Sequence, residues 1–158
     1  IATPWHQDLP YYCVDGKQNV SFWIPLDPIK KKISLKCISK SHLTGKIHRP
    51  KRFNGNDLYK NDNTEELPDI EKNINSYNIL SWDMEPGDAI AFDFRIIHGA
   101  GANSNESLRR RVFSARWVGE KTRFVNRNGK GSPPFDHLNL NTGDELNVDD
   151  FPIVYRNN

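Results

Sequence analysis

The stretch EPGDAIAFDFRIIH, residues 85–98, decides the fold class that this sequence predicts. It opens with Pro86-Gly87-Asp88, a strong turn signal, and continues as a run of apolar and aromatic residues with single polar residues between them. A run of this length and composition, preceded by a turn, is typical of a β-strand. We therefore predict one strand over residues 89–98, ending at His98.

Four further segments have the composition of strands. They are rich in Val, Ile, Phe and Trp, or they alternate apolar with polar residues. These segments cover residues 19–26, 33–38, 78–84 and 110–118. Short strands separated by Gly and Pro turns, with almost no helix, predict a mainly β domain built as a sandwich or barrel.

A long polar stretch, residues 39–76, separates the second and third of these four strands. It is rich in Lys, Asn and Asp, and its one plausible helix covers residues 65–74. Long loops inside compact domains are usually functional or disordered. We expect a single domain over residues 1–158, with a core over about 1–125 and an irregular C-terminal extension over about 126–158.

Composition excludes several classes of partner. The chain has 22 basic and 20 acidic residues, so its formal charge is only +2 and gives no global case for nucleic acid or a membrane surface. No run approaches the ~18 consecutive apolar residues of a membrane helix. Basic residues cluster at residues 30–32, 46–52 and 109–111, and we interpret the first two clusters as solvated surface.

The chain begins without Met and leads directly into a predicted strand, which indicates a fragment of something longer. No leader with a basic start and an apolar stretch is visible. Cys13 and Cys37 match no metal spacing and are too few for a disulfide framework. We interpret them as buried or half-buried thiols in a reducing compartment, which makes the cytoplasm the expected location.

His6-Gln7-Asp8 is the first candidate for chemistry. On an extended chain, residues two apart project to the same side, so His6 and Asp8 can reach one point while Gln7 points away. The pattern alone has a high false-positive rate, because such a pair arises by chance in a chain with this many His and Asp residues.

His98 adds a third ligand. It ends an apolar strand and is followed by Gly99-Ala100-Gly101, where the backbone can turn and approach closely. Two His and one carboxylate form the facial triad of non-haem iron enzymes, whereas zinc prefers a closed tetrahedral site or a third His. The competing interpretation of His98 is a hydrogen-bonded core histidine. We interpret His42 as structural, and His48 and His137 as surface residues.

Arg109, Arg110 and Arg111 follow His98 at the head of the next predicted strand. An arginine is the best partner for a buried carboxylate, because its fork binds in two places and stays charged. Strand alternation puts Arg109 and Arg111 on one face and Arg110 on the other, so the residues themselves do not choose among them. The competing interpretation is that all three are surface or phosphate-facing cations.

The ordered set of motifs resembles the phytanoyl-CoA dioxygenase family over about residues 3–125. The matching elements are Trp5-His6-Gln7-Asp8, Phe22-Trp23-Ile24-Pro25-Leu26-Asp27, Ser41-His42, Pro86-Gly87-Asp88, His98-Gly99 and Leu108-Arg109-Arg110. Each element is common, but the ordered set is specific. Two departures are Lys40, where the family usually has Gly, and the missing elements that usually precede the His-x-Asp motif.

This resemblance implies a double-stranded β-helix, or jelly roll, here an incomplete roll lacking N-terminal elements. It implies iron(II) bound by His6, Asp8 and His98, and 2-oxoglutarate held by Arg109, eleven residues after His98. Trp23 is either a core aromatic or a residue that lines the 2-oxoglutarate pocket. Because Asp8 is present, the resemblance implies hydroxylation rather than the halogenation of relatives that lack this carboxylate.

We therefore expect an iron(II)- and 2-oxoglutarate-dependent dioxygenase that hydroxylates a small organic or acyl substrate with oxygen and releases succinate and carbon dioxide. No nucleic-acid or membrane partner is expected. One alternative is a cupin-type enzyme that uses another divalent metal. The other is a non-catalytic jelly roll that binds a metabolite.

Overall fold

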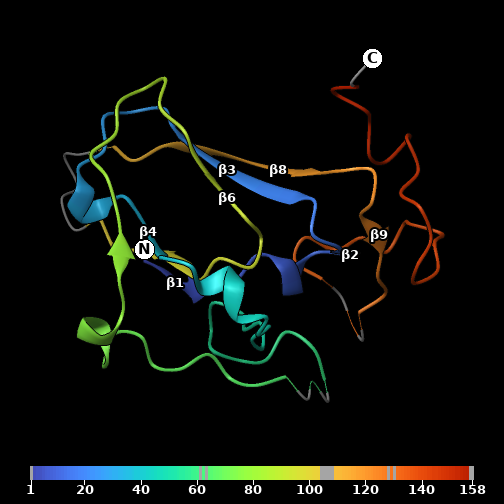
Figure 1. Ribbon diagram of the computed structural model, residues 1–158, viewed down its shortest axis with the longest axis horizontal. Helices are drawn as coiled ribbons and strands as arrows, with labels where there is room; N and C mark the ends of the chain where they lie inside the picture. Colours follow the sequence, from blue (N-terminus) through green and yellow to red (C-terminus); the bar gives the residue numbers. More distant parts are fainter. Residues whose placement is uncertain are drawn as a thin grey trace.

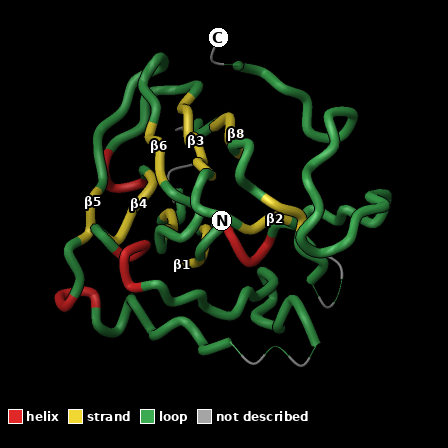
Figure 2. Tube along the Cα trace, turned by 45° about the vertical axis from the view of Figure 1, so that its right-hand side comes forward, coloured by secondary structure: helices red, strands yellow, loops and turns green. Residues whose placement is uncertain are grey.

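The computed structural model describes residues 2–60, 62, 64–103, 109–127, 129 and 131–156 (Figure 1). Within them, short strands are joined by long irregular connections, as the tube in Figure 2 shows. The strands are β1 (Thr3–His6), β2 (Val14–Asp15), β3 (Asn19–Pro25), β4 (Leu35–Ile38), β5 (Ile79–Leu80), β6 (Ile90–Phe92), β7 (His98–Ala100), β8 (Val112–Val118) and β9 (Arg123–Phe124). Four short 3-10 helices are η1 (Leu9–Tyr11), η2 (Lys31–Ile33), η3 (Ser41–Thr44) and η4 (Ile74–Ser76).

Two antiparallel sheets face each other. One has the strand order β6-β3-β8 and the other has the order β1-β7-β4-β5, while β2 and β9 form a separate pair. Residues of both sheets share one buried cluster, in which Trp23 and Phe92 of the first sheet pack with Leu35 and Cys37 of the second. The main core therefore lies between the two sheets.

Strand β3 shows why this packing follows from the sequence. Its residues alternate strictly, so that Ser21 and Trp23 are buried while Phe22 and Ile24 on the opposite face are only half-buried. Because side chains on a strand alternate between the two faces, this pattern puts one face of β3 against the core. The paired strand β8 contributes exposed Phe113 and Trp117 to the same outer face.

The predicted single strand over residues 89–98 is wrong, since the chain forms two strands there that belong to different sheets. Between β6 and β7, Asp93 accepts hydrogen bonds from the backbone N–H and the Nε of Arg95, both at 2.8 Å. The N–H of Ile96 also donates to the carbonyl of Asp93 at 2.9 Å. Asp side chains favour such turns, and this one carries the chain from one sheet to the other.

The predicted helix over residues 65–74 is also wrong, because that segment forms turns that lead into η4. Leu67 precedes Pro68, and a residue before proline is driven away from the helical region. Ile70 is buried against Ile38 and Ile97, so the segment covers the outer side of the second sheet. In Figure 1 this long connection, drawn in cyan to green, runs along the bottom of the view.

The C-terminal extension adopts neither helix nor strand over the described part of residues 126–156, as the sequence indicates. Phe135, Leu138 and Leu146 pack against a second cluster that contains Leu9 and Phe94. Both cysteines are buried free thiols. None of the helices in the described ranges has the length and apolar character needed to span a membrane.

Candidate metal centre

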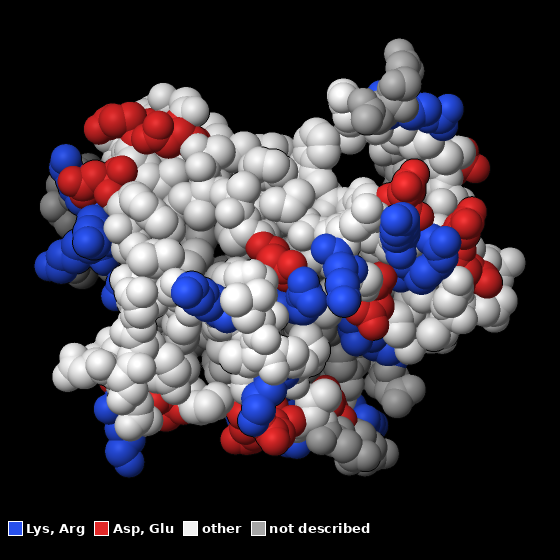
Figure 3. Space-filling model, viewed as in Figure 1, with Lys and Arg blue, Asp and Glu red and all other residues white. Residues whose placement is uncertain are grey.

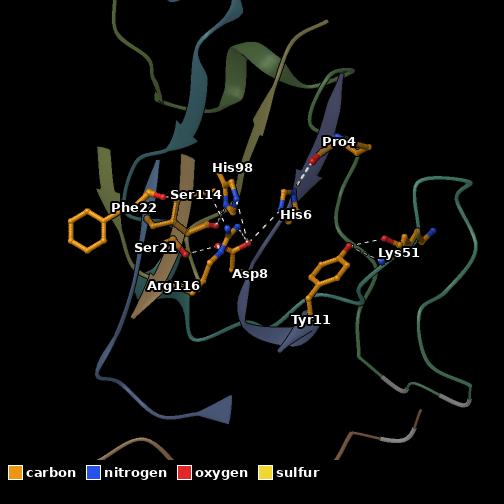
Figure 4. Close-up of polar contacts among 11 residues, drawn as sticks. Pro4, His6, Asp8, Tyr11, Ser21, Phe22, Lys51, His98, Ser114 and Arg116 are labelled. Carbon is orange, nitrogen blue, oxygen red and sulfur yellow. Dashed lines mark hydrogen bonds and ion pairs between the residues drawn. The ribbon is translucent and has the colours of Figure 1, made fainter. Parts of the chain in front are cut away.

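Three elements bring His6, Asp8 and His98 together. His6 is the last residue of β1, and its Cα is paired with that of His98 across the antiparallel β1–β7 ladder. Asp8 lies just before η1, where the chain leaves the sheet. One ligand atom from each residue lies within 4.8 Å of the others, and Figure 4 shows the three side chains pointing toward one another.

Both histidines present the same ring nitrogen to the centre. Nδ1 of His6 lies 2.8 Å from the carbonyl of Pro4, and Nδ1 of His98 lies 2.9 Å from the carbonyl of Ile96. A carbonyl only accepts, so each Nδ1 carries a proton, and Nε2 is the ring nitrogen that faces the centre. The two Nε2 atoms lie 3.6 Å and 3.7 Å from Oδ1 of Asp8. Two Nε2 atoms and one carboxylate therefore face a common point, which suits a divalent transition metal.

Asp8 is ionised although it is buried. Burial opposes ionisation, but the contact with His6, the neighbouring His98 and Arg116, and the hydrogen bond from Ser21 outweigh it. Together these contacts hold the pKa of the Asp8 carboxyl well below its usual range. The site thus has an anionic ligand available at neutral pH.

His98 is neutral for a complementary reason. Burial, followed by the neighbouring His6, lowers the pKa of His98 to about 3, although the nearby Asp8 acts in the other direction. The ring of Phe92 lies 4.5 Å from the His98 ring, centroid to centroid, and contributes to this apolar environment. A neutral imidazole is the form that binds a metal.

Two partners of Asp8, Arg116 and Ser21, are not among the residues predicted from the sequence. Nε of Arg116 lies 3.2 Å from Oδ2 of Asp8, and Nη2 of Arg116 lies 3.2 Å from Oδ1. Ser21, a fully buried residue of β3, donates its hydroxyl to Oδ2. The guanidinium of Arg116 also lies over the ring of Tyr12, 5.5 Å from its centroid. The one available signal was strand alternation, because Arg116 has the same parity on β8 as the core residue Val112.

The structure separates Arg109 from Arg110. Arg111 binds Asp27 on the outer side of β8, and Arg109 is exposed. Arg110 is half-buried. It lies two residues before Val112 and therefore on the same, inner face of the strand. Its Nη1 donates to the carbonyls of Ile33 at 2.8 Å and Gly101 at 2.6 Å. Arg110 is therefore the member of this pair that faces the interior.

The other singled-out residues divide between the core and the surface. Trp23 lies on the inner face of β3 in the main core, next to Phe92. Ser41 bridges the carbonyl of Ile38 and the N–H of Ile97, which supports a structural role for the Ser41-His42 element. His137 is a surface residue, as the sequence indicates.

The surface interpretation of His48 is wrong, because only 8% of the residue is exposed. It belongs to the basic segment over residues 46–52, most of which lies against a cavity of about 580 Å³ beside the metal-ligand cluster. Aromatic and aliphatic residues of the cavity wall are Trp5, Tyr11, Phe53, Leu58, Leu67 and Ile70. On the face drawn in Figure 3, acidic and basic side chains are interspersed, without a field of one sign.

Gln7 ties this cavity wall to the ligand cluster. Its Nε2 donates to the carbonyls of Lys46 at 3.0 Å and Arg95 at 2.8 Å, and its Oε1 accepts from the N–H of His48 at 2.8 Å. The hydroxyl of Tyr11 is likewise paired with the N–H and carbonyl of Lys51. The residue between the two ligands thus points away from the centre, as predicted, and holds the neighbouring segments.

Comparison with solved structures identifies the class of fold. The non-heme alpha-ketoglutarate-dependent epimerase SnoN of nogalamycin biosynthesis superposes with a TM-score of 0.67 at 20% identity, over 99% of this chain and 57% of that chain. The carbocyclase SnoK of the same biosynthesis gives 0.64 at 20% identity, over 93% and 53%. EvdO2 from Micromonospora carbonacea var. aurantiaca, complexed with 2-oxoglutarate, gives 0.52 at 23% identity, over 75% and 48%.

These similarities confirm the predicted jelly-roll, cupin-like fold. The chain spans little more than half the length of SnoN and SnoK. SnoN has also been solved with Fe³⁺ and alpha-ketoglutarate bound. Iron and 2-oxoglutarate are therefore bound in solved structures that share this fold.

A sequence model of the phytanoyl-CoA dioxygenase family matches residues 2–112, which is more than half of the chain. The chain belongs to this family, as the ordered motifs indicate. No functionally curated protein matches it significantly.

Proposed function

We propose that this chain carries the active site of an iron(II)- and 2-oxoglutarate-dependent oxygenase, with His6, Asp8 and His98 as the metal ligands. The observation that carries the proposal is the convergence of two Nε2 atoms and a buried carboxylate on one point. Bound iron would supply the activation of oxygen, coupled to oxidative decarboxylation of 2-oxoglutarate. The protein itself fixes the ligand set, orients both substrates and excludes water.

Arg110 is the residue best suited to bind the far carboxylate of 2-oxoglutarate. We transfer this role from Arg109, because Arg109 is exposed whereas Arg110 is half-buried. The Nη1 of Arg110 donates to the backbone carbonyls of Ile33 and Gly101, which holds the guanidinium on the inner side of the sheet. Trp23 and Phe92 lie in the main core, where the ring of Phe92 packs against that of His98, and both are candidates for the pocket wall.

The cavity that His6 and Asp8 help to line suits the organic substrate. A volume of about 580 Å³ and a wall of aromatic, aliphatic and proline residues favour a bulky, largely apolar small molecule. Hydroxylation is the reaction we expect from the retained carboxylate of Asp8. The epimerase and carbocyclase activities in the names of SnoN and SnoK make epimerisation and ring closure alternative outcomes of the same oxidation.

Succinate formation tests the proposal. Supplied with iron(II), 2-oxoglutarate and oxygen, the protein should release succinate even without its organic substrate, at a slow uncoupled rate. The Asp8→Ala variant should release none above background, because it lacks the anionic protein ligand. Turnover with zinc but not iron(II) would support a cupin-type enzyme instead, and ligand binding without turnover would support a binding protein.

A further inference from the structure

We propose that Arg116 and Ser21 are positioning residues that hold Oδ2 of Asp8, so that the carboxylate presents Oδ1 alone to the metal. This inference rests on the proposed metal centre and assigns a role to two residues outside the ligand set.

The two oxygens of Asp8 have different surroundings. Oδ1 faces the Nε2 atoms of His6 and His98 at 3.6 Å and 3.7 Å. Oδ2 points the other way, where it accepts from the Ser21 hydroxyl and from Nε of Arg116. Nη2 of Arg116 also lies 3.2 Å from Oδ1, so the guanidinium lies edge-on to the whole carboxylate (Figure 4).

Strand pairing fixes both partners. Ser21 and Arg116 are register partners across the β3–β8 ladder, so their Cα atoms lie opposite each other. Ser21 is fully buried, and the Arg116 guanidinium is further held by the hydroxyl of Ser114 at 2.5 Å and by the ring of Tyr12. Asp8 belongs to neither strand. The β3–β8 pair therefore anchors a ligand that lies in the connection after β1.

The way in which Asp8 binds determines how many coordination positions of the metal stay open. A carboxylate that binds through both oxygens would take up a coordination position that a bidentate co-substrate and oxygen require. With Oδ2 engaged by two donors, one-oxygen binding is favoured. Outer-shell partners of this kind orient the ligand, and their loss typically weakens metal binding about 10- to 100-fold.

The test measures cobalt(II) affinity and the visible absorption of the bound ion, neither of which needs turnover. Arg116→Leu and Ser21→Ala should each weaken cobalt(II) binding by about 10- to 100-fold and change the absorption spectrum. Arg116→Lys should recover part of the affinity, since it keeps one charged donor. Arg111→Leu is the matched control. Arg111, the residue before β8, also pairs with an aspartate, Asp27, but on the outer side of the sheet.

Three results would overturn the proposal. The first is a cobalt(II) affinity of Arg116→Leu and Ser21→Ala within about twofold of the wild type. The second is an equal loss of cobalt(II) affinity in Arg111→Leu. The third is tighter cobalt(II) binding in Arg116→Leu, which would mean that repulsion of the metal by the arginine dominates. Ser21→Ala keeps the test decisive if Arg116→Leu does not fold. Wild-type cobalt(II) binding without any succinate formation would refute the proposed oxygenase while leaving this assignment to be judged on affinity.

Discussion

The ionisation states of Asp8 and His98 are set by their neighbours rather than by the two side chains themselves. Asp8 is held as a carboxylate by its contact with His6, by the neighbouring His98 and Arg116, and by the hydrogen bond from Ser21. His98 is held neutral by burial and donates its Nδ1 proton to the carbonyl of Ile96. These are the forms that bind a metal, so the centre needs little reorganisation before it binds one.

The protonation of His98 predicts a pH dependence of stability. Its pKa is lowered from 6.5 to about 3 in the folded protein, so the unfolded chain binds more protons between these values. The free energy of unfolding of the metal-free protein should therefore decrease as the pH falls below about 6.5. Urea unfolding in the presence of a chelator, at pH steps from 7 to 4.5, measures this. We expect a flatter dependence in His98→Gln, and an unchanged slope in that variant would refute the assignment.

The choice between Arg110 and Arg109 predicts opposite results for two adjacent variants. Arg110→Ala should raise the apparent 2-oxoglutarate constant by about two orders of magnitude, because loss of a buried charged pair costs about 2–5 kcal/mol. Arg109→Ala should change it little, because Arg109 is exposed. The 2-oxoglutarate dependence of succinate formation measures both. A large effect confined to Arg109→Ala would return the role to that residue.

At the scale of elements, Gln7 connects three segments through a single side chain. Gln7→Leu should reduce the free energy of unfolding by about 2–4 kcal/mol, because it leaves backbone groups of Lys46, His48 and Arg95 without partners in a buried environment. Gln18→Leu is the control. Its Oε1 accepts from the N–H of Lys121 at an exposed position, so we expect a change within about 0.5 kcal/mol. Equal urea midpoints for the wild type and Gln7→Leu would contradict this account.

Element prediction succeeded where one physical signal dominated. The apolar alternation of residues 19–26 and 110–118 predicted β3 and β8 to within two residues at each end. It failed at Asp93, where a side-chain turn that strand propensity does not register divides one predicted strand into two. It also failed for residues 65–74, where burial of Ile70 and the effect of Pro68 override helical composition.

The part of the candidate site that depends on local sequence patterns was predictable. The spacing of His6 and Asp8 and the strand-end position of His98 were visible in the sequence. Arg116 and Ser21 were not, because they meet Asp8 only through the register of two strands distant from it in sequence. The position of the basic segment over residues 46–52 also depends on contacts between residues distant in sequence. The N–H groups of His48 and Lys51 donate hydrogen bonds to Gln7 and Tyr11, and these bonds hold the segment beside the cavity.

At the scale of the whole molecule, the β6-β3-β8 sheet has an apolar outer face. Phe113 and Trp117 are 57% and 44% exposed, and they lie opposite Ile24 and Val20 across the ladder. Exposed apolar patches lower solubility. The double variant Phe113→Lys, Trp117→Lys should therefore precipitate at a higher ammonium sulfate concentration than the wild type. Leu43→Lys, which removes a single exposed side chain, should have a smaller effect. No difference between the two variants would contradict this prediction.

His6, Asp8 and His98 should together bind one metal ion, and an anaerobic calorimetric titration with iron(II) measures this binding. The account predicts one ion per chain, with affinity reduced at least about 100-fold in Asp8→Ala because the only anionic ligand is lost. Asp27→Ala should bind as the wild type does, since Asp27 pairs with Arg111 outside the centre. Absence of iron binding by the wild type, or equal binding by Asp8→Ala, would contradict the account.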